Sequence, residues 1–333
     1  MAKRDKLTQR QKRQIARSQK QKLAKEQELV ELGDLSPPQK GLLSSRYGEQ
    51  ADVISLDDRQ TYRCYLRQNL GAPVPGDQVQ FRLSNNGQGV VEAILSRKSE
   101  LTRPAQHQGV KPVVANIDNV FIVIAPLPDF SSTLLDRYLV AVESAGLKPI
   151  IVANKWDLED EIATQEIEEQ LEIYARLNYP LIKLSAKTNL GVASLMEHAE
   201  ECHSILVGQS GVGKSSLINR LFPSQESLVN QVSENSRLGQ HTTTASRLFL
   251  FENCEGFIVD SPGVREFGLW HMEQEDIAEG FIEFRDYIGG CRFRDCKHRN
   301  EPGCEIINAV KSDKISEQRW VNYCKILDSL DAN

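Results

Sequence analysis

The apolar positions of the N-terminal third of the chain fall in short runs that are separated by turns. These runs occupy residues 41–47, 52–56, 61–66, 78–82 and 90–94. Turn sequences such as Pro75-Gly-Asp77 lie between them. Five short strands within about sixty residues predict a small β-barrel of the OB type, an architecture that often binds oligonucleotides.

The polar and aromatic side chains of this predicted barrel allow two interpretations. In the first, they form a basic face on which RNA bases can stack. That face would be made by Arg63, Arg67, Arg82, Tyr62 and Tyr65. In the second, the aromatic residues fill the barrel core, and we expect this of Phe81. The pattern supports the barrel shape more strongly than any single RNA contact.

A different pattern begins near residue 119. Continuous apolar runs at 119–125, 149–153, 181–184, 203–207 and 257–260 alternate with amphipathic segments. The amphipathic segments predict helices at 134–145, 161–177 and 191–202. Continuous apolar runs are typical of parallel strands that are buried on both faces. The alternation therefore predicts a doubly wound α/β sheet.

These patterns divide the chain into several predicted domains. We expect a basic flexible arm at 1–40, the OB-fold barrel at 41–97, the α/β domain at 98–266 and a mostly helical domain at 267–333. The helical domain is expected to end in an amphipathic helix at 314–330. Residues 96–112 have low periodicity and two prolines, so they are expected to be a linker.

Charge is concentrated at the N-terminus. Residues 1–25 contain ten lysines and arginines against one acid, a net charge of +9; because the whole chain carries −6, the other residues carry −15. A basic arm indicates a polyanionic partner such as RNA, although it can also serve only to keep the chain soluble. The sequence has no signal-peptide pattern and no apolar run of transmembrane length. We therefore expect a cytoplasmic protein without a membrane partner.

A glycine-rich stretch follows the run at 203–207. It reads Gly208-Gln-Ser-Gly-Val-Gly-Lys-Ser-Ser216 and precedes a predicted helix. In that context the G-x-x-x-x-G-K-[ST] pattern is a phosphate-binding P-loop. Its glycines let backbone N–H groups face a polyphosphate, and the helix N-terminus favours negative charge. Lys214 is expected to reach the β- and γ-phosphates, and the Ser215 hydroxyl to hold Mg²⁺.

The sequence Asn154-Lys-Trp-Asp157 follows another predicted buried strand. It indicates which base the bound nucleotide carries. The Asp157 carboxylate can accept hydrogen bonds from the N1–H and the amino group of guanine, whereas adenine offers neither donor. Two hydrogen bonds to a charged group, each worth roughly 1.5–3 kcal/mol, favour guanine well over tenfold. Asn154 is expected to hold this loop, Lys155 to cover the base plane, and Ser185-Ala-Lys187 to close the pocket.

The elements expected to sense the γ-phosphate come after the P-loop. Asp260-Ser-Pro-Gly263 matches the D-x-x-G element of GTP-binding proteins, and Thr243 lies in a polar segment typical of a switch loop. The predicted Mg²⁺ ligands are Ser215, Thr243 and Asp260. The residues predicted to bind GTP are Asn154, Lys155, Trp156, Asp157, Ser185, Ala186, Lys187, Gly208, Gln209, Ser210, Gly211, Val212, Gly213, Lys214, Ser215, Ser216, Thr243, Asp260 and Gly263.

A Cys/His cluster lies near the C-terminus, with the pattern Cys291-x₄-Cys296-x-His298-x₅-Cys304. Three thiolates and one imidazole suit tetrahedral Zn²⁺. Four protein ligands leave no open coordination position, so the expected role is structural. The other cysteines are expected to be reduced packing residues. Basic residues around the cluster can bind phosphates or be merely solvated; these are Arg292, Arg294, Lys297, His298 and Arg299.

The order of these motifs is unusual. GTP-binding proteins ordinarily run from the P-loop through the switch threonine and D-x-x-G to N-K-x-D and S-A-K, whereas here the last two come first. This circular permutation, the leading barrel and the C-terminal Cys/His cluster together resemble the RsgA (YjeQ) family of ribosome small-subunit-dependent GTPases. The resemblance covers essentially the whole chain from about Gly41.

This resemblance implies a GTP hydrolase that binds the small ribosomal subunit through its rRNA and acts in late maturation of the subunit. It also implies that the subunit stimulates hydrolysis and that hydrolysis is coupled to release of the factor. The expected cofactors are one structural Zn²⁺ and the Mg²⁺ that accompanies GTP. We expect the chain to act as a monomer.

The residue that positions the attacking water needs a separate explanation. Ras-type proteins use a glutamine after D-x-x-G, and this chain has Val264 there, which cannot orient water. His241 in the switch segment can accept or orient a proton near neutral pH, so it is the catalytic candidate. The family resemblance points to the same residue. The alternative is a surface histidine that contacts RNA or solvent.

Two other functions compete with this interpretation. The chain can be an RNA-binding assembly factor whose GTP pocket is only a sensor, or a metabolic P-loop enzyme. Asp157 and the basic arm disfavour the metabolic enzyme. The chain also passes almost directly from D-x-x-G into the C-terminal domain. We therefore hypothesise that the nucleotide state changes the orientation of this domain relative to the barrel.

Overall fold

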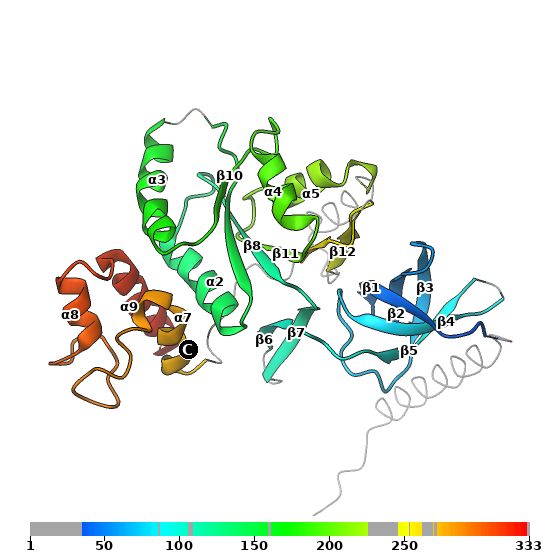
Figure 1. Ribbon diagram of the computed structural model, residues 1–333, viewed down its shortest axis with the longest axis horizontal. Coiled ribbons are helices and arrows are strands. Elements are labelled where there is room, and N and C mark those ends of the chain that lie inside the picture. The colour runs from blue at the N-terminus through cyan, green and yellow to red at the C-terminus, as the bar shows by residue number, and fades with distance from the viewer. Residues whose placement is uncertain are drawn as a thin grey trace, which may run out of the picture.

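A computed structural model of the chain describes residues 35–85, 87–105, 109–158, 161–225, 246–252, 254–261, 269 and 272–331. The predicted basic arm lies outside these residues except at its end, where Gln39 and Lys40 already belong to the first strand. Figure 1 shows a β-barrel, a central sheet flanked by helices, and a group of C-terminal helices. No helix of the described ranges is long and apolar enough to cross a membrane.

The five strands predicted at the N-terminus form a closed barrel. They are β1 (Gln39–Tyr47), β2 (Gln50–Ser55), β3 (Thr61–Leu66), β4 (Gln78–Leu83) and β5 (Gly89–Ile94). The strands pair in the order β1-β2-β3-β5-β4, and β4 pairs back with β1. Phe81 is fully buried with Leu43 and Val79, which confirms its expected place in the core. Its ring is therefore unavailable to RNA bases.

The central sheet confirms the predicted α/β architecture. Its strands are β8 (Asn119–Ile124), β9 (Lys148–Ala153), β10 (Leu181–Lys183), β11 (His203–Val207), β12 (Arg247–Leu250) and β13 (Phe257–Asp260). Its helices are α2 (Ser132–Ser144), α3 (Glu161–Arg176), α4 (Val192–Ala199) and α5 (Lys214–Leu221), with a 3-10 turn η1 (Pro223–Gln225) after α5. The strand order is β10-β9-β8-β11-β13-β12, and only β12 runs antiparallel to its neighbour β13.

The side chains of β8 explain why the buried strands lack an alternating polar pattern. Val120 and Ile122 pack into the cluster that contains the apolar residues of α2 and α3. Phe121 and Val123 point to the other face and pack with the apolar residues of α4 and α5. Both faces of the strand are covered by helices, so all positions from Val120 to Ile124 are apolar, as expected for a doubly wound sheet.

The segment expected to be a linker contains a two-stranded antiparallel sheet instead. Its strands are β6 (Glu100–Ala105) and β7 (Gly109–Ala115). Leu101 and Val114 are almost fully buried and join the main core cluster. The linker interpretation was wrong because Pro104 and Pro112 obscure the strand pattern. Prolines are tolerated here because a two-stranded sheet consists of edge strands only.

The C-terminal helices share an apolar core with α2. They are α7 (Gln274–Gly280), a 3-10 turn η2 (Ile282–Phe284), α8 (Glu305–Lys311) and α9 (Glu317–Asp331). Tyr323 of α9 is fully buried and meets the rings of Phe281 and Phe284 edge-on, with centroid distances of 5.6 and 5.3 Å. These residues belong to the same apolar cluster as α2. The helical group is therefore joined to the central sheet by a shared core.

Candidate nucleotide and metal sites

The P-loop lies between β11 and α5, where only glycine fits at two positions. Gly208 has φ of 141°, and a Cβ there would lie 2.3 Å from the carbonyl oxygen of Val123. Gly213 has φ of 98°, and a Cβ there would lie 2.3 Å from Nδ2 of Asn154. These glycines let the loop turn sharply at the start of α5 while it packs closely against its neighbours.

Lys214, at the start of α5, folds back over the P-loop. Its ammonium donates hydrogen bonds to the carbonyl oxygens of Gly208, at 2.7 Å, and Gln209, at 2.8 Å. These contacts hold a positive charge above the loop whose geometry suits a polyphosphate. The loop conformation thus already places the lysine over the site.

Asn154 connects the P-loop to both segments that were predicted to bind the base. Its side chain is almost fully buried. Its Nδ2 donates to the carbonyl oxygen of Val212, at 2.8 Å, and its Oδ1 accepts from the N–H of Ala186, at 3.1 Å. One amide therefore fixes three loops that are far apart in sequence. The structure brings together the P-loop, the Asn154–Asp157 segment and the Ser185–Lys187 segment.

The Asp157 carboxylate is ionised and ready to accept hydrogen bonds. A hydrogen bond from the Ser185 hydroxyl, helped by the nearby Lys187 ammonium, lowers the pKa of Asp157. The Lys187 Nζ lies 3.9 Å from this carboxylate. Lys155 adopts a left-handed conformation, with φ of 63°, and donates from Nζ to the carbonyl oxygen of Leu127 at 2.7 Å. The Asn154–Asp157 segment is thus tied both to Leu127 and to the Ser185–Lys187 segment.

Asp260 ends β13, opposite Leu206 of the P-loop strand. Its side chain is only slightly exposed, and burial raises its pKa while the Lys214 ammonium opposes that rise. The next residue, Ser261, shares a hydrogen bond of 2.8 Å with Ser246, which immediately precedes β12. The predicted residues His241, Thr243 and Gly263 lie outside the described residues, as does Val264.

Arg220 is a residue of this site that the motifs did not reveal. It lies in the last turn of α5 and donates from Nε to the carbonyl oxygen of Ala186, at 3.1 Å. A second nitrogen donates to the carbonyl oxygen of Lys187, at 3.2 Å. The helix after the P-loop therefore holds the segment that closes the base pocket. An arginine in an amphipathic helix carries no local signal of this contact.

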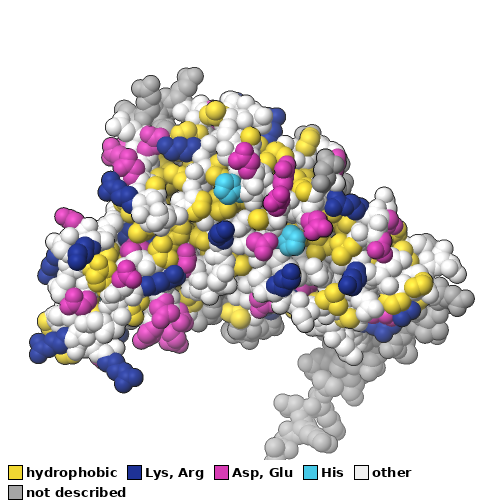
Figure 2. Space-filling view, in the orientation of Figure 1, with side chains coloured by type: hydrophobic (Ala, Val, Ile, Leu, Met, Phe, Trp, Pro, Cys, Tyr) yellow, Lys and Arg dark blue, Asp and Glu magenta, His cyan; other side chains and the backbone are white. Residues whose placement is uncertain are grey.

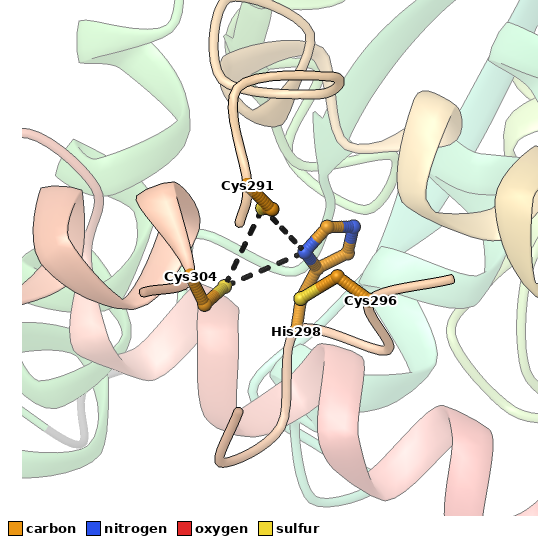
Figure 3. Close-up of side chains that lie close together, drawn as sticks. All are labelled: Cys291, Cys296, His298 and Cys304. Atoms are coloured by element: carbon orange, nitrogen blue, oxygen red, sulfur yellow. Dashed lines mark hydrogen bonds between the residues drawn. The ribbon is translucent and has the colours of Figure 1, made fainter. Parts of the chain in front are cut away.

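The Cys/His cluster has the geometry of a four-ligand metal site. Figure 3 shows the side chains of Cys291, Cys296, His298 and Cys304 converging on one point, and their ligand atoms all lie within 4.8 Å of one another. The Cys291 and Cys304 sulfurs are 3.9 Å apart, and each lies 3.5 Å from Nδ1 of His298. A tetrahedral Zn²⁺ site has separations of about 3.8 Å and about 3.6 Å for such pairs. These residues can therefore hold a metal ion.

The surroundings of the cluster support this fit. Burial lowers the pKa of His298, so its imidazole is neutral and can donate a lone pair to a metal. Burial also raises the pKa of Cys296, with contributions from neighbouring thiols. Thiols packed this closely become thiolates readily only beside a cation. The carbonyl oxygen of His298 accepts a hydrogen bond of 2.8 Å from the indole of Trp320, which fixes the loop.

The three arginines of the predicted basic face of the barrel are all paired with carboxylates. Arg63 pairs with Asp52 at 2.6 Å, and Arg67 and Arg82 both pair with Glu92 at 2.9 Å. Each of these arginines therefore already has an anionic partner. The barrel face offers a phosphate less net positive charge than the sequence indicated.

The loop between Cys291 and His298 differs from the barrel in this respect. Arg292, Arg294 and Lys297 are exposed, and none of them forms an ion pair within the described part of the chain. Phe293 between them is 43% exposed, and the Arg292 guanidinium lies 5.5 Å from its ring centroid. Lys and Arg side chains project from the lower left of the face seen in Figure 2, over the C-terminal helices. An exposed ring flanked by cations is suited to nucleic acid.

Comparison with known families gives a direct match. The family model described as RsgA GTPase matches residues 94–270 of this chain. "Small ribosomal subunit biogenesis GTPase RsgA" of Photorhabdus laumondii is 47% identical over 336 residues, which cover 98% of this chain and 95% of that protein. The protein of the same name from Ectopseudomonas mendocina is 47% identical over 306 residues, which cover 91% and 89%.

Two crystal structures share the architecture. YjeQ from Thermotoga maritima is 34% identical, with a TM-score of 0.72, and the match covers 89% of this chain and 100% of that one. YloQ, described as a circularly permuted GTPase, is 26% identical with a TM-score of 0.67, and the match covers 89% and 96%. The permuted motif order, the barrel and the C-terminal helices are therefore shared with solved structures.

Proposed function

This chain belongs to the RsgA family of GTPases, and on that premise we propose that it hydrolyses GTP on the small ribosomal subunit during late maturation of the subunit. Hydrolysis is stimulated by the subunit and drives release of the factor. The contact that supports this proposal best is made by Asn154, which joins the P-loop to both base-binding segments. The relatives whose name states small-subunit biogenesis match nearly the whole chain.

In this proposal the nucleotide lies between the P-loop and the Asn154–Asp157 segment. The ionised Asp157 carboxylate accepts the N1–H and amino protons of guanine. The Lys155 stem and Trp156 border the base plane, and Ser185, Ala186 and Lys187 close the pocket. Residues 208–216 wrap the phosphates, and Lys214 exchanges its two carbonyl partners for phosphate oxygens. Adenine leaves the Asp157 carboxylate without donors, so ATP is excluded.

The chemical step needs a stabilised γ-phosphate and an oriented water. Ser215, Thr243 and Asp260 would hold Mg²⁺, which supplies positive charge to the β- and γ-phosphate oxygens. The Gly263 N–H is proposed to donate to the γ-phosphate. His241 is proposed to orient the attacking water, because Val264 cannot do so. His241 is further proposed to be brought into position by the bound subunit, which would make the rate depend on the subunit.

The Cys/His cluster is proposed to hold one structural Zn²⁺ through Cys291, Cys296, His298 and Cys304. The ion would fix the loop that displays Arg292, Phe293 and Arg294. These exposed side chains are proposed to contact phosphates and an unpaired base of the rRNA. The barrel contributes less through its paired arginines. We further propose that the protein is cytoplasmic and binds the subunit as a monomer.

One experiment separates this function from its alternatives. Turnover of GTP and of ATP is measured with and without purified small ribosomal subunits. The proposed function predicts slow GTP turnover that rises with subunits and negligible ATP turnover. GTP binding without any subunit-dependent turnover would instead indicate an RNA-binding factor with a sensor pocket. Equal turnover of both nucleotides would indicate a metabolic P-loop enzyme.

A further inference from the structure

The hairpin formed by β12 and β13 occupies a particular position in this permuted chain. β12 begins at Arg247, directly after the segment that contains His241 and Thr243. β13 ends at Asp260, the first residue of the D-x-x-G element. Both switch segments are thus attached to the open end of one hairpin. Its closed end, residues 251–256, lies at the opposite end of these strands.

One barrel residue bonds to the closed end of this hairpin, which the central domain also holds through a hydrogen bond from the N–H of Gly256 to the carbonyl oxygen of Glu200, at 2.9 Å. Arg59, in the loop between β2 and β3, donates to the carbonyl oxygens of Phe251, at 3.0 Å, and Glu252, at 2.7 Å. Its other terminal nitrogen donates to the carbonyl oxygen of Cys254, at 3.0 Å. Three charge-assisted hydrogen bonds from one planar guanidinium fix the orientation of this turn relative to the barrel.

The barrel loop is organised to present Arg59. Arg59 has φ of 57°, a left-handed conformation that is unfavourable for arginine, and its N–H donates to the carbonyl oxygen of Ser55 at 3.0 Å. The Asp58 carboxylate accepts from the N–H of Gln60, at 2.9 Å, and from the Tyr62 hydroxyl, at 2.6 Å. Unlike Arg63, Arg59 has no carboxylate partner in the described residues. Its guanidinium instead donates to three backbone carbonyl oxygens of the hairpin turn.

The barrel also contacts the open end of the hairpin. Ser45 of β1 is paired with Arg247 of β12, so the barrel and the central sheet form one continuous eleven-stranded sheet. Within the hairpin, backbone pairs run from Arg247 opposite Asp260 to Leu250 opposite Phe257. This ladder resists slippage of one strand against the other. A displacement of the turn is therefore transmitted to the ends that carry the switches.

From these contacts we propose that Arg59 is a positioning residue that couples the barrel to the two switch segments. When the small subunit binds the barrel as well as the loop between Cys291 and His298, the Arg59 contact transmits the change in barrel orientation to the β12–β13 hairpin. The hairpin then moves the switch segments into the arrangement that hydrolyses GTP. This inference rests on the proposed function, because it names how the subunit would stimulate the reaction.

Two variants of Arg59 test the coupling. Arg59→Gly removes the guanidinium and accepts the left-handed conformation without strain, so it is expected to fold. Arg59→Lys keeps the charge but cannot reach three carbonyl oxygens with a planar fork. Arg67→Ala is the matched control, because Arg67 is an exposed barrel arginine that pairs with Glu92 and does not touch the hairpin.

The first measurement is GTP hydrolysis as a function of subunit concentration. For Arg59→Gly we expect the subunit-stimulated kcat to fall by roughly tenfold, a common size for coupling between sites. The unstimulated rate, the GTP affinity and the half-saturating subunit concentration should stay within about twofold of those of the unaltered chain. The subunit-stimulated kcat of Arg59→Lys should lie between those of Arg59→Gly and the unaltered chain. Arg67→Ala should behave as the unaltered chain.

The second measurement needs no ribosomal subunit. Hydrogen exchange of β1 and β2 is compared between the GDP form and a form with a non-hydrolysable GTP analogue. We expect the nucleotide to change the protection of these barrel strands in the unaltered chain and not in Arg59→Gly. If subunits fail to stimulate the unaltered chain, the proposed function is wrong, and hydrogen exchange alone decides the coupling.

Two results would overturn the inference. One is full subunit stimulation of Arg59→Gly together with an unchanged nucleotide effect on β1 and β2. The other is an equal loss of unstimulated rate, GTP affinity and thermal stability in Arg59→Gly, because that pattern indicates a structural role only.

Discussion

Arg319 of the last helix lies fully buried against Asp136 of α2, with a direct ion pair between their side chains. The same guanidinium pairs with Glu283 at 2.6 and 2.9 Å. Asp136 also accepts hydrogen bonds from the Tyr174 hydroxyl, at 2.8 Å, and from Nδ2 of Asn322, at 2.7 Å. Residues from α2, α3, η2 and α9 thus share one buried polar network. It ties the C-terminal helices to the central sheet.

This network bears on the hypothesis that the nucleotide state reorients the C-terminal domain relative to the barrel. The C-terminal helices share both an apolar core and this ionic network with α2. Breaking the network would leave buried charges without partners, which is costly. We therefore expect the C-terminal helices and the central sheet to move together. A change of orientation would occur where the sheet meets the barrel, at the Ser45–Arg247 pair and the Arg59 contacts.

Removing the Arg319 guanidinium should strongly destabilise the protein. Arg319→Ala leaves the carboxylates of Asp136 and Glu283 buried without a cation, which typically costs about 3–5 kcal/mol. Urea unfolding followed by circular dichroism measures the change. Arg176→Ala is the control, because the Arg176–Glu172 pair is largely exposed and should be worth less than about 1 kcal/mol. Equal losses in the two variants would contradict the buried role of Arg319.

Base selection should change predictably when Asp157 is altered. In Asp157→Asn, the carboxylate that accepts two guanine protons becomes an amide with only one acceptor and two new donors. GTP affinity should fall by more than about tenfold, and xanthosine triphosphate, which has a carbonyl oxygen at the amino position, should gain affinity. Equilibrium binding of both nucleotides is the measurement. Unchanged GTP affinity would show that Asp157 does not bind the base.

Arg220 should support nucleotide binding without touching the nucleotide. Arg220→Ala releases the carbonyl oxygens of Ala186 and Lys187, so the segment that closes the base pocket loses two hydrogen bonds. Each such bond contributes about 0.5–1.5 kcal/mol, so the loss of both should lower GDP affinity by at least roughly fivefold and by at most about a hundredfold. Titration with fluorescent GDP tests this. Arg220→Lys should recover part of the lost GDP affinity. An unchanged GDP affinity in Arg220→Ala, or no recovery in Arg220→Lys, would refute the role of this contact.

Loss of the metal should unfold the loop that carries Arg292 and Phe293. Cys296→Ser removes one ligand, and we expect zinc content to drop well below one ion per chain and the melting temperature to fall. Zinc content is measured by elemental analysis, and unfolding by calorimetry with and without a chelator. Cys202→Ser is the control, because Cys202 lies outside the cluster. A full complement of zinc in Cys296→Ser would exclude Cys296 as a ligand.

His241→Ala tests the proposed catalytic group. Positioned general bases typically contribute a factor of 10²–10⁴, so subunit-stimulated hydrolysis should fall by roughly a hundredfold or more. GTP affinity should be retained, because the histidine acts on water rather than on the base. His198→Ala is the control, since His198 is an exposed residue of α4. Unchanged turnover on small subunits would remove His241 from the mechanism.

Much of the candidate site follows from local sequence. The P-loop needs glycine at 208 and 213 because of close backbone approach, and the Asn154–Asp157 segment follows a buried strand that its apolar run reveals. Each motif is short, and its residues act through positions fixed by one strand and one turn. The Cys/His spacing is similarly local, and the structure brings all four residues within ligand distance.

The electrostatics of the barrel were harder to predict, because they depend on strand register. Arg63 is neutralised because Asp52 lies directly opposite it in the β2–β3 pairing. A shift of register by one residue would have placed the two side chains on opposite faces. Arg63 and Asp52 are eleven residues apart in the sequence, and no local pattern predicts that their side chains form an ion pair.

The sequence by itself therefore determined the fold class, the guanine nucleotide chemistry and the four-residue metal cluster, since those depend on periodicity and on short motifs. Only the tertiary structure decided how the parts are joined. Arg59 reaches a turn 192 residues away in the chain, and Arg319 pairs with an aspartate 183 residues away. Such contacts depend on how whole elements pack, and a side chain that makes them looks in sequence like any surface arginine.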